Sequence, residues 1–483
     1  MLHRAAATEY PVPALYLNGQ WVNGADRPTE PVLNPATGET LALLTHATTA
    51  DLDAALQAAK AAFPAWRATA PAERSRILRA AATLLRERAD HIARIMTLEQ
   101  GKPVAEARLE ILASADTYDW YAEEGRRNYG RIVPGRTLNQ RLSVLHEPVG
   151  VCAAFTPWNF PAITPARKIA GALAAGCTLI LKPAEETPNT GLELVRALHD
   201  AGLPAGVLNA VFGVPGNVSG YLLDSPDIAK FSFTGSTAVG KLLAAQAAKT
   251  LKRATMELGG HAPVIVCADA NIEKAADMLV AGKFRNAGQV CISPTRFYIA
   301  DSIYEDFLAA FVERVKKIKV GNGLEEGVTM GPMANPRRLD AMKRLVADAV
   351  QHGARVLAGG KPADDSGFFW EPTVLADIPE TAALMNEEPF GPLALMNRVQ
   401  SVDEAISRAN RLPYGLAAYA FTQDSAVRTQ LARQLQTGML GINSLAVSMP
   451  EAPFGGVKES GWGSECGIEG LQAYCDVKLI SED

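Results

Sequence analysis

Signatures of metal-binding and disulfide-stabilised proteins are missing from this 483-residue sequence. None of its six cysteines belongs to a C-x-x-C pair and its seven histidines are scattered, so we expect no metal site. Six cysteines are also too few for a disulfide framework in a chain of this length. We therefore expect free thiols in a reducing compartment.

Long apolar segments are missing as well. The longest runs, such as GVCAAF and CTLIL, are far shorter than the roughly 20 residues that cross a bilayer. The first 21 residues lack the apolar centre of a secretory signal, and Pro11 and Pro13 interrupt them. The formal net charge of −5 is too small to favour a nucleic-acid or membrane-surface partner. The sequence thus favours a cytoplasmic protein without such partners.

The glycine fingerprint G-x-G-x-x-G is also absent. Gly213, Gly216 and Gly220, in GVPGNVSG, do not fit its spacing. The pyrophosphate-binding turn of a standard Rossmann fold is therefore not expected.

What the sequence does contain is the pattern of a large α/β protein. Apolar residues make up 48% of it and charged residues 20%, and its length suggests about three domains. From residue 149 onward, unbroken apolar strands alternate with helices, as in VGVCAAFTP, ITPARKIAGALAAG and CTLILKP. This alternation predicts a parallel sheet covered on both faces. A second α/β segment begins near APVIVCADA.

The segment before residue 149 has a different pattern. LYLNGQWVNGAD and PVLNPATGETLALL predict short strands with Asn-Gly and Thr-Gly turns. Two amphipathic helices are expected next, one opening with a Thr/Asp cap in ATTADLDAALQAAKAAFPAW and one running through APAERSRILRAAATLLRERADHIARIMTLEQG to end at Gly101. RNYGRIVPGR…QRLSVLHEPVG predicts an extended hairpin arm.

Polar residues follow several of the predicted strands. Parallel sheets bind ligands beyond the carboxyl ends of their strands, which directs attention to FTPWNFP (155–161), KPAEETP (182–188) and FTGST (233–237). A Gly–Ser pair between a strand and a helix can present N–H groups and a hydroxyl to a phosphate. MELGG (256–260) joins the two α/β halves, where paired glycines permit a close approach of the backbone.

Taken singly, the candidate residues each have an ordinary structural interpretation. Glu257, in MELGG, could pair with a neighbouring arginine. Cys291, in KFRNAGQVCISPTR, could be one of the small inert hydrophobes that most buried cysteines are. Asn159 could be a turn residue or an amide donor in an apolar pocket. The residues one by one leave these alternatives open.

Their order along the chain resembles the aldehyde dehydrogenase superfamily. The resemblance rests on Asn159, Lys182, Gly–Ser, Glu257, Gly–Gly and Cys291, followed by EEPFGP (387–392) and PFGGVKESG (453–461), and it spans residue 15 to the end. Glu257 precedes Cys291 by 34 positions, a separation familiar from that family. Such a protein binds its dinucleotide without the glycine fingerprint, which accounts for its absence.

The resemblance implies an NAD(P)-dependent oxidation of an aldehyde to a carboxylic acid through a cysteine thiohemiacetal and thioester. Cys291 would be the nucleophile, since a thiolate is the best side-chain nucleophile near neutral pH. The Asn159 amide and the Cys291 N–H would stabilise the oxyanion. Glu257 would be the general base for thioester hydrolysis, with a pKa raised by its apolar neighbours.

The resemblance also implies the dinucleotide contacts. Lys182 and Glu185 would meet the adenosine ribose, Ser236 the pyrophosphate and Glu388 the nicotinamide ribose. Glu185 would place a negative charge near a 2′-phosphate, so NAD is the expected cofactor, with NADP possible as a second. The complete set of expected cofactor residues is Thr156, Pro157, Trp158, Lys182, Glu185, Gly235, Ser236, Leu258, Glu388 and Phe390.

The substrate is the harder question. Arg167 and Arg285 are expected beside the substrate entrance, where surface or interface charges are the alternative interpretation. Two converging cations favour an anionic substrate, and the stretch around Cys291 resembles succinate semialdehyde and α-ketoglutarate semialdehyde (2,5-dioxovalerate) dehydrogenases. Ser448 and Phe454 complete the expected substrate residues. Alternatives are a broad-specificity aliphatic or aromatic aldehyde dehydrogenase, a cofactor-free thiol hydrolase, and a catalytically silent member of the family.

The implied fold has two doubly wound parallel α/β domains and a β oligomerisation arm. We expect a cofactor domain over residues 1–127 and 147–256, a catalytic domain over 257–440, and the arm with the C-terminal segment over 128–146 and 441–483. A homodimer or homotetramer is expected. Ser293 occupies the position where some relatives carry a second cysteine, which excludes a local disulfide switch with Cys291.

Overall fold

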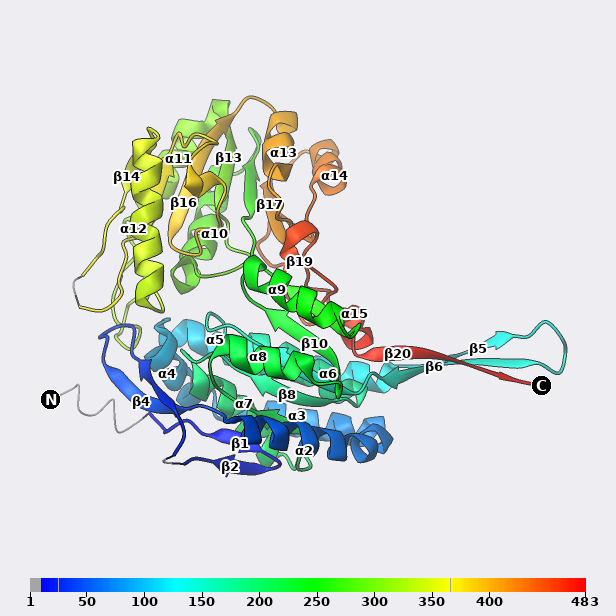
Figure 1. Ribbon diagram of the computed structural model, residues 1–483. Coiled ribbons are helices and arrows are strands. Elements are labelled where there is room, and N and C mark those ends of the chain that lie inside the picture. Colours follow the sequence, from blue (N-terminus) through cyan, green and yellow to red (C-terminus); the bar gives the residue numbers. More distant parts are fainter. Residues whose placement is uncertain (1–9, 25, 365) are drawn as a thin grey trace.

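Two helix-flanked β-sheets and a thin projecting arm make up the chain (Figure 1). The computed structural model describes residues 10–24, 26–364 and 366–483. Residues 1–9, which belong to the segment where no secretory signal is expected, lie outside the described residues. Within the described ranges, no helix combines the length and the apolar character needed to cross a membrane.

The first sheet contains the parallel strands predicted from the alternating pattern. Its order is β19 (Gly461–Trp462), β11 (Arg253–Glu257), β10 (Ile228–Thr234), β7 (Val151–Phe155), β8 (Thr178–Lys182), β9 (Leu208–Ala210), β1 (Leu15–Leu17) and β2 (Gln20–Val22). The strands from β11 to β9 run parallel, while β19, β1 and β2 pair antiparallel at the two edges. Asn18 and Gly19 form the predicted turn between β1 and β2.

Helices cover both faces of this sheet. They are α2 (Thr49–Ala68), α3 (Pro71–Glu87), α4 (Ala89–Gln100), α5 (Val104–Glu124), η1 (Gly125–Arg127), α6 (Ile163–Ala175), α7 (Pro188–Asp200), α8 (Pro215–Asp224) and α9 (Thr237–Ala248). Helices α8 and α9 pack side by side on one face, and α6 packs on the other beneath α3 and α5. Thr48 and Asp51 form the predicted cap of α2, each side chain accepting the other's backbone N–H.

The expectation of one helix from residue 71 to Gly101 is wrong. The helix breaks at Arg88, whose φ of −96° and ψ of 5° separate α3 from α4. Both helices pack against α5 and α7, and α3 also packs against α6, while Ala89 and Ile92 at the start of α4 are buried. Apolar periodicity continues through the break, so the sequence pattern does not reveal it. Gly101 ends α4 as predicted, in the left-handed conformation with φ of 97°.

The second sheet is also mainly parallel. Its order is β14 (Arg355–Ala358), β15 (Thr373–Ala376), β16 (Leu393–Val399), β13 (Arg296–Ala300), β12 (Pro263–Val266), β17 (Ala417–Phe421) and β18 (Met439–Ile442), with β14 alone antiparallel. Its helices are α10 (Ile272–Phe284), η2 (Arg285–Gly288), η3 (Asp301–Ile303), α11 (Tyr304–Val315), α12 (Pro336–Gln351), η4 (Ala383–Met385), α13 (Val402–Asn410) and α14 (Ser425–Gln434).

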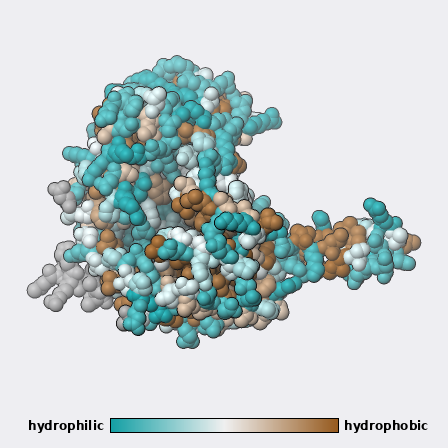
Figure 2. All heavy atoms as spheres, in the orientation of Figure 1, coloured by the Kyte–Doolittle hydropathy of each residue, from teal (hydrophilic) through white to brown (hydrophobic). Residues whose placement is uncertain are grey.

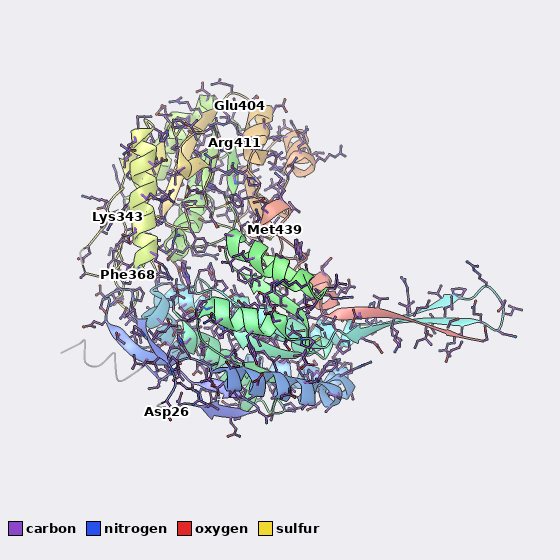
Figure 3. All side chains as sticks on the ribbon, in the orientation of Figure 1. Asp26, Lys343, Phe368, Glu404, Arg411 and Met439 are labelled. Atoms are coloured by element: carbon purple, nitrogen blue, oxygen red, sulfur yellow. The ribbon has the colours of Figure 1, made fainter. Side chains whose placement is uncertain are left out.

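Each sheet has its own apolar core, and loops tie the two halves together. Phe368, labelled in Figure 3 where the loop after β14 reaches the lower half, donates its backbone N–H to the Pro35 carbonyl at 3.0 Å. The Val104 N–H, at the start of α5, donates to the Gly323 carbonyl at 3.1 Å. The halves are therefore held at a fixed distance on either side of the loop that carries Glu257.

The predicted hairpin is confirmed and extends away from the body. It consists of β5 (Arg131–Pro134) and β6 (Arg141–Pro148), and β20 (Cys475–Glu482) pairs with β6 along its whole length. Figure 2 shows brown apolar patches on this arm, where Ile132, Val477 and Leu479 are each more than 60% exposed. The remaining elements are the hairpin β3 (Thr29–Leu33) and β4 (Thr40–Thr45), η5 (Lys458–Ser460) and α15 (Gly467–Gln472). The domain boundaries expected from the sequence stay a prediction.

Candidate active site

A large cavity of about 1260 Å³ lies at the carboxyl ends of the strands of the first sheet, where the second sheet faces them. The cavity brings together all of the candidate residues identified in the sequence. They are Thr156, Pro157, Trp158, Asn159, Arg167, Lys182, Glu185, Gly235, Ser236, Glu257, Leu258, Arg285, Cys291, Glu388, Phe390, Ser448 and Phe454.

The parallel sheet explains why residues so distant in sequence meet. Strands β7, β8, β10 and β11 end at Phe155, Lys182, Thr234 and Glu257, and each is followed by a loop that lines the cavity. Because these strands are parallel and adjacent, their carboxyl ends lie along one edge. The second half supplies the opposite wall from the loop before β13, which carries Cys291.

Two consecutive glycines let the halves approach each other closely. A Cβ on Gly259 would lie 2.6 Å from Glu388 Oε2, and one on Gly260 would lie 2.7 Å from the Cys291 carbonyl oxygen. The Gly260 N–H donates to Glu388 Oε1 at 3.0 Å. Gly259 and Gly260 thus allow the close approach of the backbone that the sequence predicts, here to Glu388 and to the Cys291 carbonyl.

The loop that carries Cys291 has an unusual backbone. Asn286 and Ala287 have φ values of 49° and 52°, a left-handed conformation that non-glycine residues rarely adopt. Cys291 itself is half-buried. Its enclosure in the cavity, together with the charges of Glu388 and Glu257, raises the pKa of the thiol to about 12, while the charge of Arg167 lowers it. The thiol therefore needs a proton acceptor before it can react near neutral pH.

Glu257 is buried without a partner. The residue is 3% exposed, and neither carboxylate oxygen has a hydrogen-bond partner among the residues that the structure describes. Burial raises its pKa well above the usual range, and the nearby Glu465 raises it further, against the opposing charges of Lys168 and Arg167. A buried carboxylate that retains a free lone pair is suited to accept a proton.

Asn159 is held by three hydrogen bonds. Its Nδ2 donates to the Gln289 carbonyl at 3.0 Å, and its own carbonyl accepts from Lys102 Nζ at 2.9 Å and Asn286 Nδ2 at 2.8 Å. A side-chain amide has two N–H groups. The second can donate into the cavity that Asn159 shares with Cys291.

The two candidate arginines lie against aromatic rings. The Arg167 guanidinium carbon is 4.1 Å from the centroid of the Phe454 ring, and its Nη2 donates to Ser448 Oγ at 2.7 Å. Arg285, which is exposed, lies 5.3 Å from the centroid of the Phe160 ring. Stacked guanidinium groups keep their edge N–H groups for a ligand. This part of the cavity is suited to an anionic group attached to an apolar body.

The opposite end of the cavity has features that fit a dinucleotide. Helix α9 begins there, with Ser236 as its N-cap, and a helix of 12 residues offers open N–H groups to a phosphate. Lys182 and Glu185 form an ion pair at the end of β8. Trp158 and Phe390 stand edge to face with their centroids 5.5 Å apart beside Glu388, whose pKa is raised to about 7 by burial. The residues present thus fit two sugars, a pyrophosphate and an aromatic ring.

Sequence reasoning missed several buried charges around the cavity. Lys102, Glu106 and Glu110 come from the stretch EQGKPVAEARLE, and Glu465 forms an ion pair with Lys168. The charged residues of EQGKPVAEARLE, which follow an amphipathic helix, were the only sequence signal for these buried charges. The same pattern is equally typical of a solvated loop.

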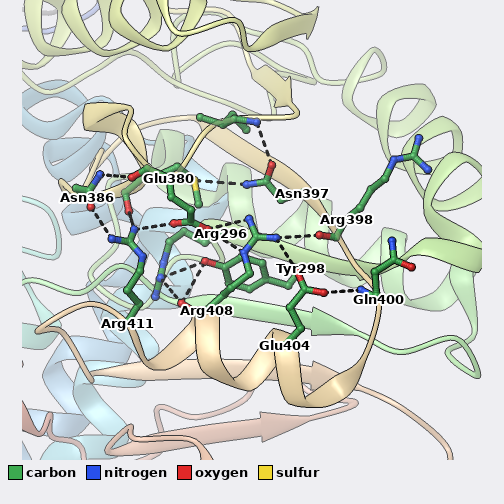
Figure 4. Close-up of polar contacts among 12 residues, drawn as sticks. Arg296, Tyr298, Glu380, Asn386, Asn397, Arg398, Gln400, Glu404, Arg408 and Arg411 are labelled. Atoms are coloured by element: carbon green, nitrogen blue, oxygen red, sulfur yellow. Dashed lines mark hydrogen bonds and ion pairs between the residues drawn. The ribbon is translucent and has the colours of Figure 1, made fainter.

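The strand that follows the Cys291 loop is anchored by a buried network (Figure 4). Arg296, at the start of β13, donates to the carbonyls of His261 and Ala409 at 2.9 and 3.1 Å. Arg408 and Arg411, at the end of α13, both bind Glu380. The network ties the segment after the glycine pair to the strand after Cys291, on the side away from the cavity.

Comparisons with known proteins agree with this geometry. The model of the aldehyde dehydrogenase family matches residues 21–480. The 4-(hydroxymethyl)benzenesulfonate dehydrogenase of Comamonas testosteroni is 48% identical over 98% of this chain and 98% of its own. The NADP⁺ succinate-semialdehyde dehydrogenase of Escherichia coli K12 is 44% identical over 96% of each chain. The crystal structure of succinate-semialdehyde dehydrogenase from Burkholderia pseudomallei matches with a TM-score of 0.96 and 41% identity over 98% of each chain. These matches confirm the resemblance and the α/β fold class predicted from the sequence.

The unpartnered Glu257 gives a prediction about stability. Its raised pKa means that the native state binds more protons than the unfolded state, so stability is lost as pH rises from about 4.3 toward the native pKa. We expect Glu257→Gln to raise the thermal midpoint above that of wild type at pH 8, with a smaller difference at pH 5. Glu73→Gln, at an exposed carboxylate paired with Arg76, is the control and should give no such gain. If Glu257→Gln changed the thermal midpoint equally at both pH values, the pKa of Glu257 would not be raised in the native state.

Proposed function

The chain belongs to the aldehyde dehydrogenase family, and we propose that its substrate is a semialdehyde that carries a distal carboxylate, such as succinate semialdehyde or α-ketoglutarate semialdehyde. As a member of this family it is an NAD(P)-dependent oxidoreductase that acts on small aldehydes. The observation that carries the proposal is the pair of arginines, each against an aromatic ring, in the cavity that contains Cys291.

The names of the relatives support an anionic substrate. Succinate semialdehyde and 4-(hydroxymethyl)benzenesulfonate each carry a negative group away from the carbon that is oxidised. Arg167 and Ser448, already joined by a hydrogen bond, offer adjacent donors, and Arg285 offers a second cation from the exposed rim. Paired cationic donors bind carboxylates with shorter and stronger hydrogen bonds than neutral groups.

The reaction follows from the residues that surround the aldehyde. The proton of the Cys291 thiol, whose pKa is raised, first passes through Glu257 to solvent. The resulting thiolate attacks the carbonyl carbon, a C–S bond forms, and the carbonyl electron pair moves onto oxygen. The Asn159 amide and the Cys291 backbone N–H stabilise that oxyanion, a contribution that typically amounts to about 2.7–4 kcal/mol per donor. A dinucleotide held by Ser236, Glu388 and the N-terminus of α9 would supply the hydride acceptor that lets the carbonyl re-form. Cys291 then carries the acid as a thioester.

Glu257 completes the cycle. It takes a proton from a water molecule, whose oxygen attacks the thioester carbon, and the C–S bond breaks to release the carboxylic acid and the thiolate. Its raised pKa favours proton uptake, and the positive charge of Arg167 favours the released thiolate. The proposed catalytic set is therefore Cys291, Glu257 and Asn159.

We propose that the dinucleotide lies between α9 and the glycine pair. Ser236 and the α9 N-terminus would hold the pyrophosphate, Lys182 and Glu185 the adenosine ribose, and Glu388 the nicotinamide ribose. Thr156, Pro157, Trp158, Gly235, Leu258 and Phe390 line the rest of that path. NAD is the preferred cofactor in this proposal because Glu185 carries a negative charge where NADP adds a phosphate, and the ion pair with Lys182 leaves NADP usable.

The exposed arm suggests how copies assemble. Its apolar side chains and the open edge of β5 invite pairing with another chain. We propose a homodimer or homotetramer built through this arm. All six cysteines are free, which fits the proposed cytoplasmic location.

Replacing the nucleophile tests the mechanism. We expect Cys291→Ala to abolish aldehyde-dependent NAD(P)H formation while dinucleotide binding persists, because Cys291 makes the covalent intermediate. Cys267→Ala, at another free cysteine, is the matched control and should retain activity. Absorbance at 340 nm and dinucleotide fluorescence titration are the measurements. Turnover by Cys291→Ala would refute the covalent route.

Replacing the arginines tests the substrate class. We expect Arg167→Ala and Arg285→Ala each to lower the ratio of kcat/KM for succinate semialdehyde to that for butyraldehyde by about tenfold or more, since about 1.4 kcal/mol corresponds to tenfold. Arg337→Ala, at the dinucleotide end of the same cavity, should leave the ratio unchanged. If neither candidate arginine alters the ratio, a broad-specificity aldehyde dehydrogenase is the better description.

Replacing Glu185 tests the cofactor preference. Glu185→Gln removes the negative charge near the proposed 2′-phosphate, so we expect the ratio of kcat/KM for NADP to that for NAD to rise severalfold, on the order of 1 kcal/mol for one nearby charge. Glu193→Gln, on α7 and paired with Arg196, is the control. A wild-type enzyme that prefers NADP would overturn the preference proposed here.

A further inference from the structure

The charged stretch before α5 contacts the candidate oxyanion residue directly. Lys102 Nζ donates to the main-chain carbonyl of Asn159 at 2.9 Å, across 57 positions of sequence. We propose that Lys102 is a positioning residue, which fixes the Asn159 backbone and so aims the Asn159 amide at the oxyanion site beside Cys291. This inference rests on the oxyanion role proposed above for Asn159.

The bond to the carbonyl constrains the side chain through the backbone. The Asn159 carbonyl also accepts from Asn286 Nδ2 at 2.8 Å, and Asn159 Nδ2 donates to the Gln289 carbonyl. These bonds fix the Asn159 main-chain carbonyl and one N–H of its side-chain amide. The direction of the second amide N–H is then fixed as well. Catalytic donors must be held within about 0.5 Å of their productive position, which such bonds accomplish.

Lys102 and its ion-pair partner Glu110 together bind the chain at Asn159 and just after it. Its ammonium lies 2.5 Å from Glu110 Oε2, and both side chains are almost fully buried. The other oxygen, Glu110 Oε1, accepts the backbone N–H groups of Ala162 and Ile163 at 2.8 and 3.1 Å. The pair therefore holds the chain at residue 159 and again three residues later, where α6 begins.

The same stretch also reaches the loop of the nucleophile. Gln100 Nε2 donates to Asn286 Oδ1 at 2.8 Å, and Glu106 Oε2 accepts the Asn286 backbone N–H at 2.9 Å. Asn286 has the left-handed φ described above, so it needs external support. Residues 100–110 thus set the distance between the Asn159 amide and the loop that ends at Cys291.

A purely structural role explains this arrangement less well. A buried ion pair pays a desolvation cost, and apolar side chains of similar volume often stabilise a core equally well. Burial lowers the pKa of Lys102 while the charge of Glu110 raises it, so the pair is mutually dependent. The ammonium also lies 4.2 Å from the Phe160 ring centroid, the ring against which Arg285 lies. The ammonium of Lys102 therefore contacts Glu110, Asn159 and Phe160, all of which line the cavity.

The test is a double-mutant cycle of Lys102→Met and Asn159→Ala. Rates are divided by the active-site concentration, taken from the fraction of Cys291 that iodoacetamide alkylates. We expect Lys102→Met to lower kcat about 10–100-fold, the usual effect of a small misplacement of a catalytic group. KM and the dinucleotide dissociation constant should stay within about twofold. In the Asn159→Ala background, Lys102→Met should change kcat by less than about threefold, because the two act as one unit.

Two further variants separate positioning from general stability. Lys230→Met removes another buried lysine, which donates to Thr255 and lies over the Tyr474 ring away from the cavity, and should leave kcat unchanged. Glu110→Gln weakens the pair that holds the Asn159 segment, so it should lower kcat in the same direction as Lys102→Met, and this effect should also be lost in the Asn159→Ala background. Lys102→Arg, which retains a donor, should keep kcat closer to wild type than Lys102→Met does; should Lys102→Met fail to fold, Lys102→Gln, with a shorter and uncharged side chain, replaces it in the cycle.

The outcomes distinguish this inference from the proposed function. If Asn159→Ala lowers kcat and the effect of Lys102→Met multiplies with it, the positioning role is wrong while the oxyanion role stands. If Lys230→Met lowers kcat as much as Lys102→Met, or if the effect of Glu110→Gln persists in the Asn159→Ala background, the loss reflects stability or charge balance, and positioning is again wrong. If Asn159→Ala leaves kcat unchanged, both the oxyanion role and the inference built on it are wrong.

Discussion

The close contact of Gly259 and Gly260 with the opposite half is the constraint on which the rest of the site depends. A side chain on either glycine would collide with Glu388 or with the Cys291 backbone. Only this contact allows Glu257, at the end of one sheet, to face a nucleophile supplied by the other. The network around Arg296 fixes the chain on the far side of the same contact. Contacts between loops of the two halves, such as the hydrogen bond from the Phe368 N–H to the Pro35 carbonyl, join the halves at further points.

Burial in the cavity raises the pKa values of several acidic groups. Glu257 has no hydrogen-bond partner among the described residues, Cys291 has a pKa of about 12, and Glu388 one of about 7. Each shift arises mainly from burial, which penalises the ionised form. Burial also shifts groups that do not line the cavity, as with Lys283, whose pKa is lowered to about 7, whereas Arg296 is satisfied by several carbonyls. Perturbed pKa values of several carboxylates and a thiol around one cavity are typical of an active site.

The sequence predicted the alternating strands and helices better than the points at which a helix breaks. The alternation from residue 149 onward corresponds to β7, α6, β8 and α7, because buried parallel strands and amphipathic helices each have a distinct pattern. The break at Arg88 was not predicted, since both α3 and α4 keep an apolar face and the change of direction depends on what each packs against. Lys102 and Glu110 were missed for a related reason. Their type suggests solvent exposure, and only the approach of α6 and the Cys291 loop buries them.

By itself, the sequence determined the family, the α/β fold class and the identity of the candidate residues, because residue types in a fixed order are what a family shares. It could not determine their mutual arrangement. Arg167 and Arg285 read alike in sequence, yet one is buried against Phe454 and hydrogen-bonded to Ser448, while the other stands on the exposed rim beside Phe160. Tertiary structure decided this, as it decided that Glu257 has no hydrogen-bond partner among the described residues and that Lys102 binds the Asn159 carbonyl. Distances, burial and electrostatic environment depend on which segments meet across the crevice, and parallel-sheet topology brings together residues that lie far apart along the chain.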